Sequence, residues 1–130
     1  VQCEYYAMEG LSQLLKTVGL IKKRLNPELK REGIVLTMFD KRNNISRQVE
    51  QEVRLHFGEE VFHTVVPRNV KLSEAPSHGK PVILYDINST GALAYMDIAR
   101  ELMDRHDGQR SQIDPDTEEE NTPTPAEIRE

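Results

Sequence analysis

The segment VVPRNVKLSEAPSHGKP, at residues 65–81, places the end of an apolar strand directly before a polar stretch rich in proline. Each proline lacks a backbone N–H and has a fixed φ, so Pro67, Pro76 and Pro81 disfavour a long regular element. We therefore expect a strand that ends near Val66, followed by a loop. Polar groups on a loop at the carboxyl end of a buried strand are where α/β proteins place ligand contacts. A solvated connection is the simpler interpretation of composition alone.

The composition is that of one domain, or part of one, without a membrane-spanning or secretory segment. The chain has 130 residues, of which 37% are hydrophobic, and it contains no long apolar run. Its single cysteine, Cys3, has no partner for an internal disulfide, which fits a reducing cytoplasm. We expect Cys3 to be a small buried residue.

The net charge of −5 is unevenly distributed along the chain. Residues 1–104 carry 14 acidic and 14 basic side chains, whereas residues 105–130 carry 8 acidic and 3 basic ones. The second part contains DPDTEEE and TPTP, which predict an acidic, proline-containing disordered tail after a body of residues 1–104. Such a tail can aid solubility or mimic nucleic acid toward a basic patch, but plain disorder is the simplest interpretation.

Apolar periodicity predicts three helices and two strands. Spacings of three and four predict helices from about residue 8 to 25, from 45 to 57 and from 89 to 103. We expect the apolar stripe of the first helix to pack in the core, Gly58 to end the second, and Ser89 to cap the third. Short apolar runs predict strands at residues 33–39 and 61–66, with a further strand end at residues 1–4.

This alternation predicts an α/β fold, layered around a mostly parallel sheet. Two strands and a strand end would leave apolar sheet edges uncovered. We therefore expect the chain to be the C-terminal part of a larger domain.

Motifs for catalysis are missing from the sequence. It contains no G-x-x-x-x-G-K-[ST] phosphate loop, no G-x-G-x-x-G, no C-x-x-C and no H-E-x-x-H, and its histidines lack metal-ligand spacing. We expect no catalysis by this chain alone. Basic residues near the two strand ends are compatible with a phosphate-binding patch, although neighbouring glutamates equally allow a solvated charged rim.

Three ordered segments resemble the ParA/Soj family of chromosome- and plasmid-partitioning ATPases. They are QCEYYAMEGLSQLL at residues 2–15, GIVLTMFDKRNN at residues 33–44, and VVPRNVKLSEAPSHGKPVILYD at residues 65–86. The resemblance covers about residues 1–103, and it extends less closely to the cell-division regulator MinD. It implies the C-terminal half of a deviant-Walker P-loop NTPase-like, three-layer fold. The N-terminal half of that fold supplies the phosphate loop and the Mg²⁺ site.

The resemblance also implies site residues. Pro67 and Asn69, in the VPRN motif, resemble positions that contact adenine, and Asp40, in T-x-x-D from Thr37, lies where related folds place base-reading groups. Asp40 can equally cap the following turn. Arg42 and Lys71 resemble positions that bind DNA without sequence preference, and Arg68 is a third candidate.

The first functional hypothesis is a segment of a partitioning ATPase. The family resemblance implies ATP and Mg²⁺ as cofactors of the intact protein, an ATP-bound homodimer, non-specific DNA and a ParB-type centromere-binding partner, in the cytoplasm on the nucleoid. One alternative is a MinD-like regulator, which requires a membrane-binding C-terminal helix where this chain has an acidic tail. The other is a non-catalytic interaction module.

Overall fold

A parallel β-sheet forms the centre of the computed structural model, which describes residues 1–113. Strands β1 (Ile34–Phe39) and β2 (Val61–Pro67) pair in parallel, from Ile34 beside Val61 to Phe39 beside Pro67. Residues 1–3 run along the other edge of β1, where Gln2 bridges Thr37 in parallel. The predicted parallel sheet and the strand end at residues 1–4 are therefore confirmed.

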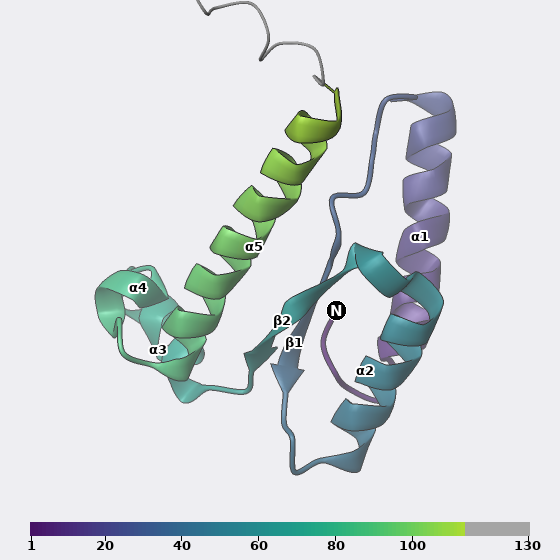
Figure 1. Ribbon diagram of the computed structural model, residues 1–130. Helices are drawn as coiled ribbons and strands as arrows, with labels where there is room; N and C mark the ends of the chain where they lie inside the picture. The colour runs from purple at the N-terminus through teal and green to yellow at the C-terminus, as the bar shows by residue number, and fades with distance from the viewer. Residues whose placement is uncertain (114–130) are drawn as a thin grey trace, which may run out of the picture.

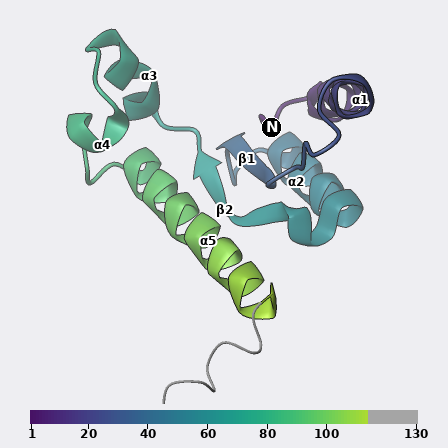
Figure 2. The same cartoon turned by 90° about the horizontal axis from the view of Figure 1, so that it is seen from above.

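Helices cover both faces of this sheet, which gives three layers (Figures 1 and 2). Helices α1 (Ala7–Arg24) and α2 (Asn44–Phe57) lie on one face, and α5 (Thr90–Ile113) lies on the other. The core between the sheet and the first two helices contains Leu11, Leu36, Val49 and Val53, all buried. Cys3 belongs to the same core, as predicted. The α/β fold class is confirmed.

Local signals set the ends of α2, the crossover helix between the two parallel strands. The Asn43 side chain accepts a hydrogen bond from the N–H of Ile45 at 2.8 Å, which caps the amino terminus. Gly58 follows the helix with φ of 49°, a left-handed conformation that favours glycine. A single 3-10 turn, η1 (Gly58–Glu60), then leads into β2.

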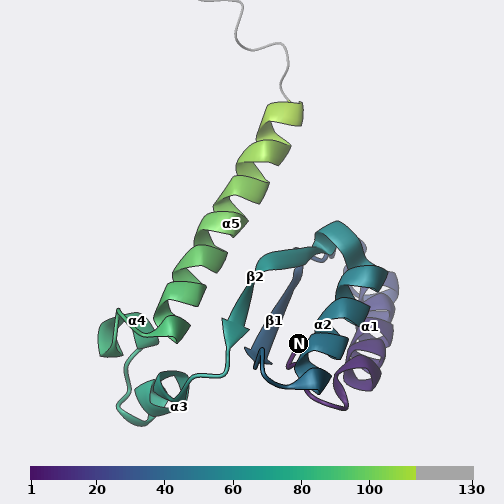
Figure 3. The same cartoon turned by 60° about the horizontal axis from the view of Figure 1, so that its bottom comes forward.

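The loop predicted for residues 67–81 is wrong over most of its length. Residues from Val70 to Ser77 form helix α3, and α4 (Val82–Tyr85) is one further turn. Asn69 caps α3, since its side chain accepts from the Lys71 N–H at 2.8 Å. Pro76 lies in the last turn of α3, where the missing N–H costs one intrahelical bond, and Gly79, with φ of 62°, follows the helix. Helices α3 and α4 lie at the carboxyl end of the strands (Figure 3).

Helix α1 departs from its predicted packing. The helix is present, but Leu11 is its only buried residue, while Leu14 is 57% exposed and Leu25 lies beyond the helix at 79%. Periodicity correctly predicted an amphipathic helix, whereas burial of the whole stripe in this chain was wrong.

Helix α5 begins as predicted, with the Ala92 N–H donating to Ser89 Oγ at 3.1 Å, but it continues to Ile113, beyond the predicted end near Met103. Residues 105–113 are therefore helical, and the rest of the predicted tail, residues 114–130, lies outside the described residues.

Helix α5 runs antiparallel to β2. At its start, Thr90 lies against Asn69, just past the strand, and toward its end Arg105 donates to the Val61 carbonyl at 3.0 Å. Between them, the Glu101 carboxylate accepts the N–H groups of His63 at 2.7 Å and Thr64 at 3.0 Å. The start of α5 therefore lies at the carboxyl edge of the sheet, and its end lies at the opposite edge. No helix within residues 1–113 is long and apolar enough to cross a membrane.

Candidate functional site

A cavity of about 410 Å³ opens where β1 and β2 end. The strands stay paired up to this point, since the Arg68 N–H donates to the Phe39 carbonyl at 2.9 Å. The lining includes strand residues and side chains from α3 and α5: Gln2, Thr37, Met38, Pro67, Arg68, Asn69, Val70, Leu72, Ser73 and Tyr95. The volume falls within the range of small-molecule sites, and such sites combine apolar walls with a few polar groups.

An irregularity in β1 exposes one wall of this cavity. The pairing register shifts between Leu36 and Phe39, and Met38 has φ of 56°, the only positive φ of a non-glycine residue in the described part of the chain. A left-handed methionine is sterically strained, and strained backbone clusters at ligand sites. The irregularity places Met38 in the cavity wall, opposite the Pro67 end of β2.

Asn69 follows the end of β2 and connects it to two helices beside the cavity, α3 and α5. Its Oδ1 caps α3, and its Nδ2 donates to Thr90 Oγ1 at 2.5 Å, at the first turn of α5. An asparagine amide has two donor hydrogens and two acceptor lone pairs, so one of each is still free for a ligand. Gly91, next to Thr90, lets α5 approach α3 closely, because a Cβ at residue 91 would lie 2.6 Å from Leu72 Cγ.

Asp40 does not line this cavity. Its carboxylate instead faces Arg42, which donates from its backbone N at 3.0 Å, from Nε at 3.1 Å and from Nη2 at 3.1 Å. Hydrogen bonds from Arg42, followed by a weaker attraction from Arg68, lower the pKa of Asp40 to about 2. In this structure Asp40 thus has the contacts of a residue that holds the turn before α2, the alternative interpretation of the T-x-x-D pattern.

The three cations proposed for DNA contact are each paired with a carboxylate. Arg42 pairs with Asp40, Arg68 pairs with Glu4, and Lys71 pairs with Glu74 at 3.0 Å. Arg42 and Arg68 both lie near Asp40, at the ends of neighbouring strands.

Lys71 lies on the first turn of α3, and its partner Glu74 also accepts a hydrogen bond at 2.9 Å from the Tyr85 hydroxyl of α4. Hydrogen bonding to Glu74 raises the pKa of Lys71, so the ammonium keeps its charge. All three cations lie at the carboxyl edge of the sheet, but a phosphate would have to compete with their partners.

Several cavity residues were not identified from sequence. The sequence predicts a loop at Leu72 and Ser73, and it carries no motif that marks Tyr95 or Thr90 as site residues. Helix α5, more than 20 positions beyond Asn69, brings Tyr95 to the cavity wall and Thr90 to the Asn69 side chain. Local sequence carries no signal for that approach.

Comparisons with known proteins agree with this fold. The family model described as "CobQ/CobB/MinD/ParA nucleotide binding domain" matches residues 3–82. The chain is 62% identical over 105 residues to "Chromosome partitioning protein ParA" of Myxococcus xanthus, covering 81% of this chain and 37% of that protein.

Two further relatives have related names. "Sporulation initiation inhibitor protein Soj" of Bacillus subtilis is 61% identical over 102 residues, which cover 78% of this chain and 40% of that protein. "Chromosome-partitioning ATPase Soj" of Thermus thermophilus is 50% identical over 105 residues, which cover 81% of this chain and 42% of that protein. The chain thus spans about two fifths of the length of these relatives. On the family match and these identities, the chain belongs to the CobQ/CobB/MinD/ParA nucleotide-binding family and, within it, to the ParA/Soj group.

Proposed function

We propose that this chain supplies the base-side wall of the nucleotide site, and a DNA-contacting surface, of a ParA/Soj-type ATPase that partitions chromosomes or plasmids. The observation that carries the proposal is the cavity at the carboxyl edge of the sheet, lined by the VPRN residues Pro67 and Asn69. In open α/β sheets, ligands bind outside the carboxyl ends of the strands.

A purine fits the chemistry of this cavity. Pro67, Met38 and Leu72 offer apolar surface to a flat ring, and Tyr95 offers an aromatic one. The free donor and acceptor of the Asn69 amide match the mixed donor and acceptor edge of adenine. We assign the adenine contact to Pro67 and Asn69, and we give Asp40 the structural role of holding the turn before α2.

The triphosphate and its metal require groups outside this chain. Within the part that the structure describes, no group of three or more His, Cys, Asp and Glu side chains is arranged to hold a metal ion. Mg²⁺ and the ATP phosphates would be held by the phosphate-loop half of the family fold. This chain would hold and orient the base.

DNA contact is proposed for Arg42, Arg68 and Lys71. Their charges lie at one edge of the sheet, and contacts to phosphate alone would give binding without sequence preference. In this proposal ATP drives homodimerisation and DNA binding on the nucleoid, and a ParB-type partner stimulates hydrolysis and release.

The test is a chimera in which this chain follows the phosphate-loop half of the Bacillus subtilis relative. We expect slow ATP hydrolysis that DNA and a ParB-type partner stimulate. Arg42→Glu and Lys71→Glu should each abolish DNA binding and leave ATP binding intact, whereas Lys16→Glu, a charge reversal on exposed α1, should change neither. A folded chimera that binds no ATP would contradict the nucleotide site, and unchanged DNA affinity in both variants would remove the DNA surface.

A further inference from the structure

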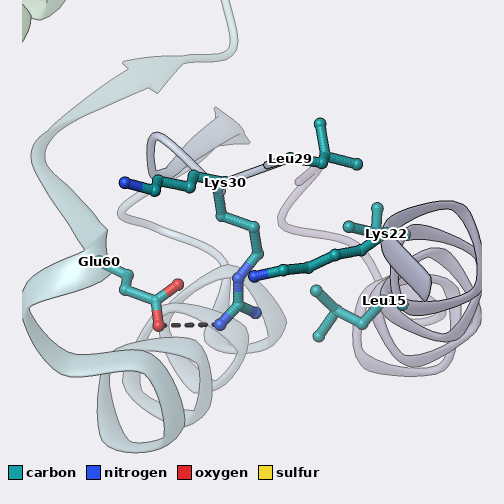
Figure 4. A pocket seen from close by; sticks show the side chains of 8 residues that line it. Leu15, Lys22, Leu29, Lys30 and Glu60 are labelled. Carbon is teal, nitrogen blue, oxygen red and sulfur yellow. Dashed lines mark hydrogen bonds and ion pairs between the residues drawn. The ribbon is translucent and has the colours of Figure 1, made fainter. Parts of the chain in front are cut away.

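A second cavity, of about 430 Å³, lies at the opposite edge of the sheet from the nucleotide site. Its walls come from the second half of α1, the connection to β1, and η1. The lining residues are Leu15, Val18, Gly19, Lys22, Leu29, Lys30, Arg31 and Glu60. Figure 4 shows Lys22 extending across the cavity from α1, with Glu60 on the opposite side. We call it the cationic pocket.

The charges of the cationic pocket are incompletely neutralised. Arg31 donates to Glu60 at 2.9 Å, so these two charges offset each other. Within the described part of the chain, neither Lys22 nor Lys30 has a carboxylate at ion-pairing distance. Two ammonium groups are thus available to an anionic occupant.

One acceptor in the pocket also lacks a donor. The Oε2 atom of Glu60 is buried and accepts no hydrogen bond from the residues that the structure describes. Because that atom is buried, an occupant could donate to it only after the Glu60 side chain turns, and a hydrogen phosphate ion or a peptide N–H could each do so. The pocket therefore selects its occupant by charge, and an acidic peptide offers carboxylates to Lys22 and Lys30.

We propose that the occupant is the acidic segment of this same chain, DPDTEEE at residues 114–120. Helix α5 delivers that segment to the correct edge of the sheet. His106 Nε2 lies 3.0 Å from Glu32 Oε1, directly beside the pocket residue Arg31. From His106 the helix continues for about 10 Å, at 1.5 Å per residue, to its end at Ile113.

The reach of the segment favours the cationic pocket over the cations at the nucleotide edge. An extended chain advances about 3.3 Å per residue, so Glu120 lies at most about 23 Å beyond Ile113. Helix α5 has 24 residues and is about 36 Å long, so a return to the start of α5 takes about 11 extended residues. A path of that length uses all of DPDTEEE before the chain reaches the start of α5.

Tethering makes the contact intramolecular. A short flexible tether gives an effective concentration in the millimolar range, so two exposed ion pairs and a few hydrogen bonds are enough to populate the docked state. The contact would mask the positive charge of the pocket. High salt would release the docked segment, because exposed ion pairs are screened within about 3 Å at 1 M salt.

The experiment is zero-length carbodiimide cross-linking of the full chain, in which a lysine amine joins a carboxylate only where the two touch. Cross-links are mapped by mass spectrometry in the monomer band. A mixture of unlabelled and isotopically labelled copies of the chain identifies links between different copies. We expect residues 114–120 to cross-link to Lys22 and Lys30 at least about fivefold more than to Lys16, Lys41 and Lys80. At 1 M salt this preference should disappear.

A second measurement uses amide NMR shifts of residues 114–120 in the full chain. Lys22→Gln with Lys30→Gln should change these shifts, whereas Lys23→Gln, on the same helix turn but outside the pocket, should not. Cross-links spread evenly over all lysines, links only between different copies, or shifts that ignore the Lys22 and Lys30 changes would each overturn the proposal.

Discussion

Replacing Asn69 by alanine separates the structural role of this side chain at the cavity from the adenine contact that we propose for it. The cap on α3 through the Lys71 N–H, at 2.8 Å, contributes about 1 kcal/mol to folding. The bond to Thr90, at 2.5 Å, adds up to about 1 kcal/mol, less where water competes. We therefore expect Asn69→Ala to lower the free energy of unfolding of the chimera by about 1–2 kcal/mol, measured by urea denaturation.

The same variant should also lose affinity for ATP. Removing the base contact should weaken ATP binding about tenfold, which corresponds to about 1.4 kcal/mol, while inorganic triphosphate should bind unchanged. Titration calorimetry with both ligands measures the difference.

Asn43→Ala is the matched control, because Asn43 caps α2 with the same geometry, at 2.8 Å to Ile45 N, but does not line the cavity. It should cost about 1 kcal/mol of stability and leave ATP affinity unchanged. Equal ATP affinities in the two variants would refute the base contact.

Two further predictions concern charged groups. Burial alone would raise the pKa of Glu101, but N–H bonds from β2 and the Arg105 guanidinium lower it to about 2. The pKa of Glu101 is lower in the folded than in the unfolded chain. Its carboxylate therefore contributes fully to folding stability above about pH 5, and this contribution is lost as pH falls toward 2. Glu101→Gln should lower the free energy of unfolding by roughly 2–3 kcal/mol at pH 7 and by almost nothing at pH 2, measured by urea denaturation across pH. As a control, Asp97→Asn, at an exposed position, should lower it by under about 0.5 kcal/mol. A loss for Glu101→Gln that does not change with pH would contradict the stabilising role of the ionised Glu101 carboxylate. Glu74→Gln frees Lys71 from its carboxylate, so DNA affinity at low salt should rise about two- to fivefold by fluorescence anisotropy, and a fall would show that the pair positions Lys71 rather than competing with phosphate.

The main elements of the fold could be predicted because their signals are local. The run at residues 34–39 is apolar enough for a strand covered on both faces, and Asn43 and Gly58 set the ends of α2 within a few residues. Helix α3 could not be predicted by counting prolines. Pro76 falls in its last turn, where only one intrahelical bond is lost, and Asn69 caps the opposite end of the helix.

The candidate site was predicted only in part, because its geometry depends on contacts between distant segments. Pro67 and Asn69 line the cavity at the end of β2, and their predicted adenine contact stays a prediction, whereas the Asp40 carboxylate faces Arg42 outside the cavity. The pairing of Arg68 with Glu4 joins residues 64 positions apart, and Tyr95 arrives on a separate helix. Neither contact has a signature in the local sequence.

Photolabelling with 8-azido-ATP tests the central claim most directly, because the azide reacts from the adenine ring. In the chimera, we expect the label to map to residues 37–38, 67–73 and 95 of this chain, and excess ATP to prevent it. Labelling confined to the phosphate-loop half, or to parts of this chain away from the carboxyl edge of the sheet, would contradict the claim that this chain forms the base-side wall of the site.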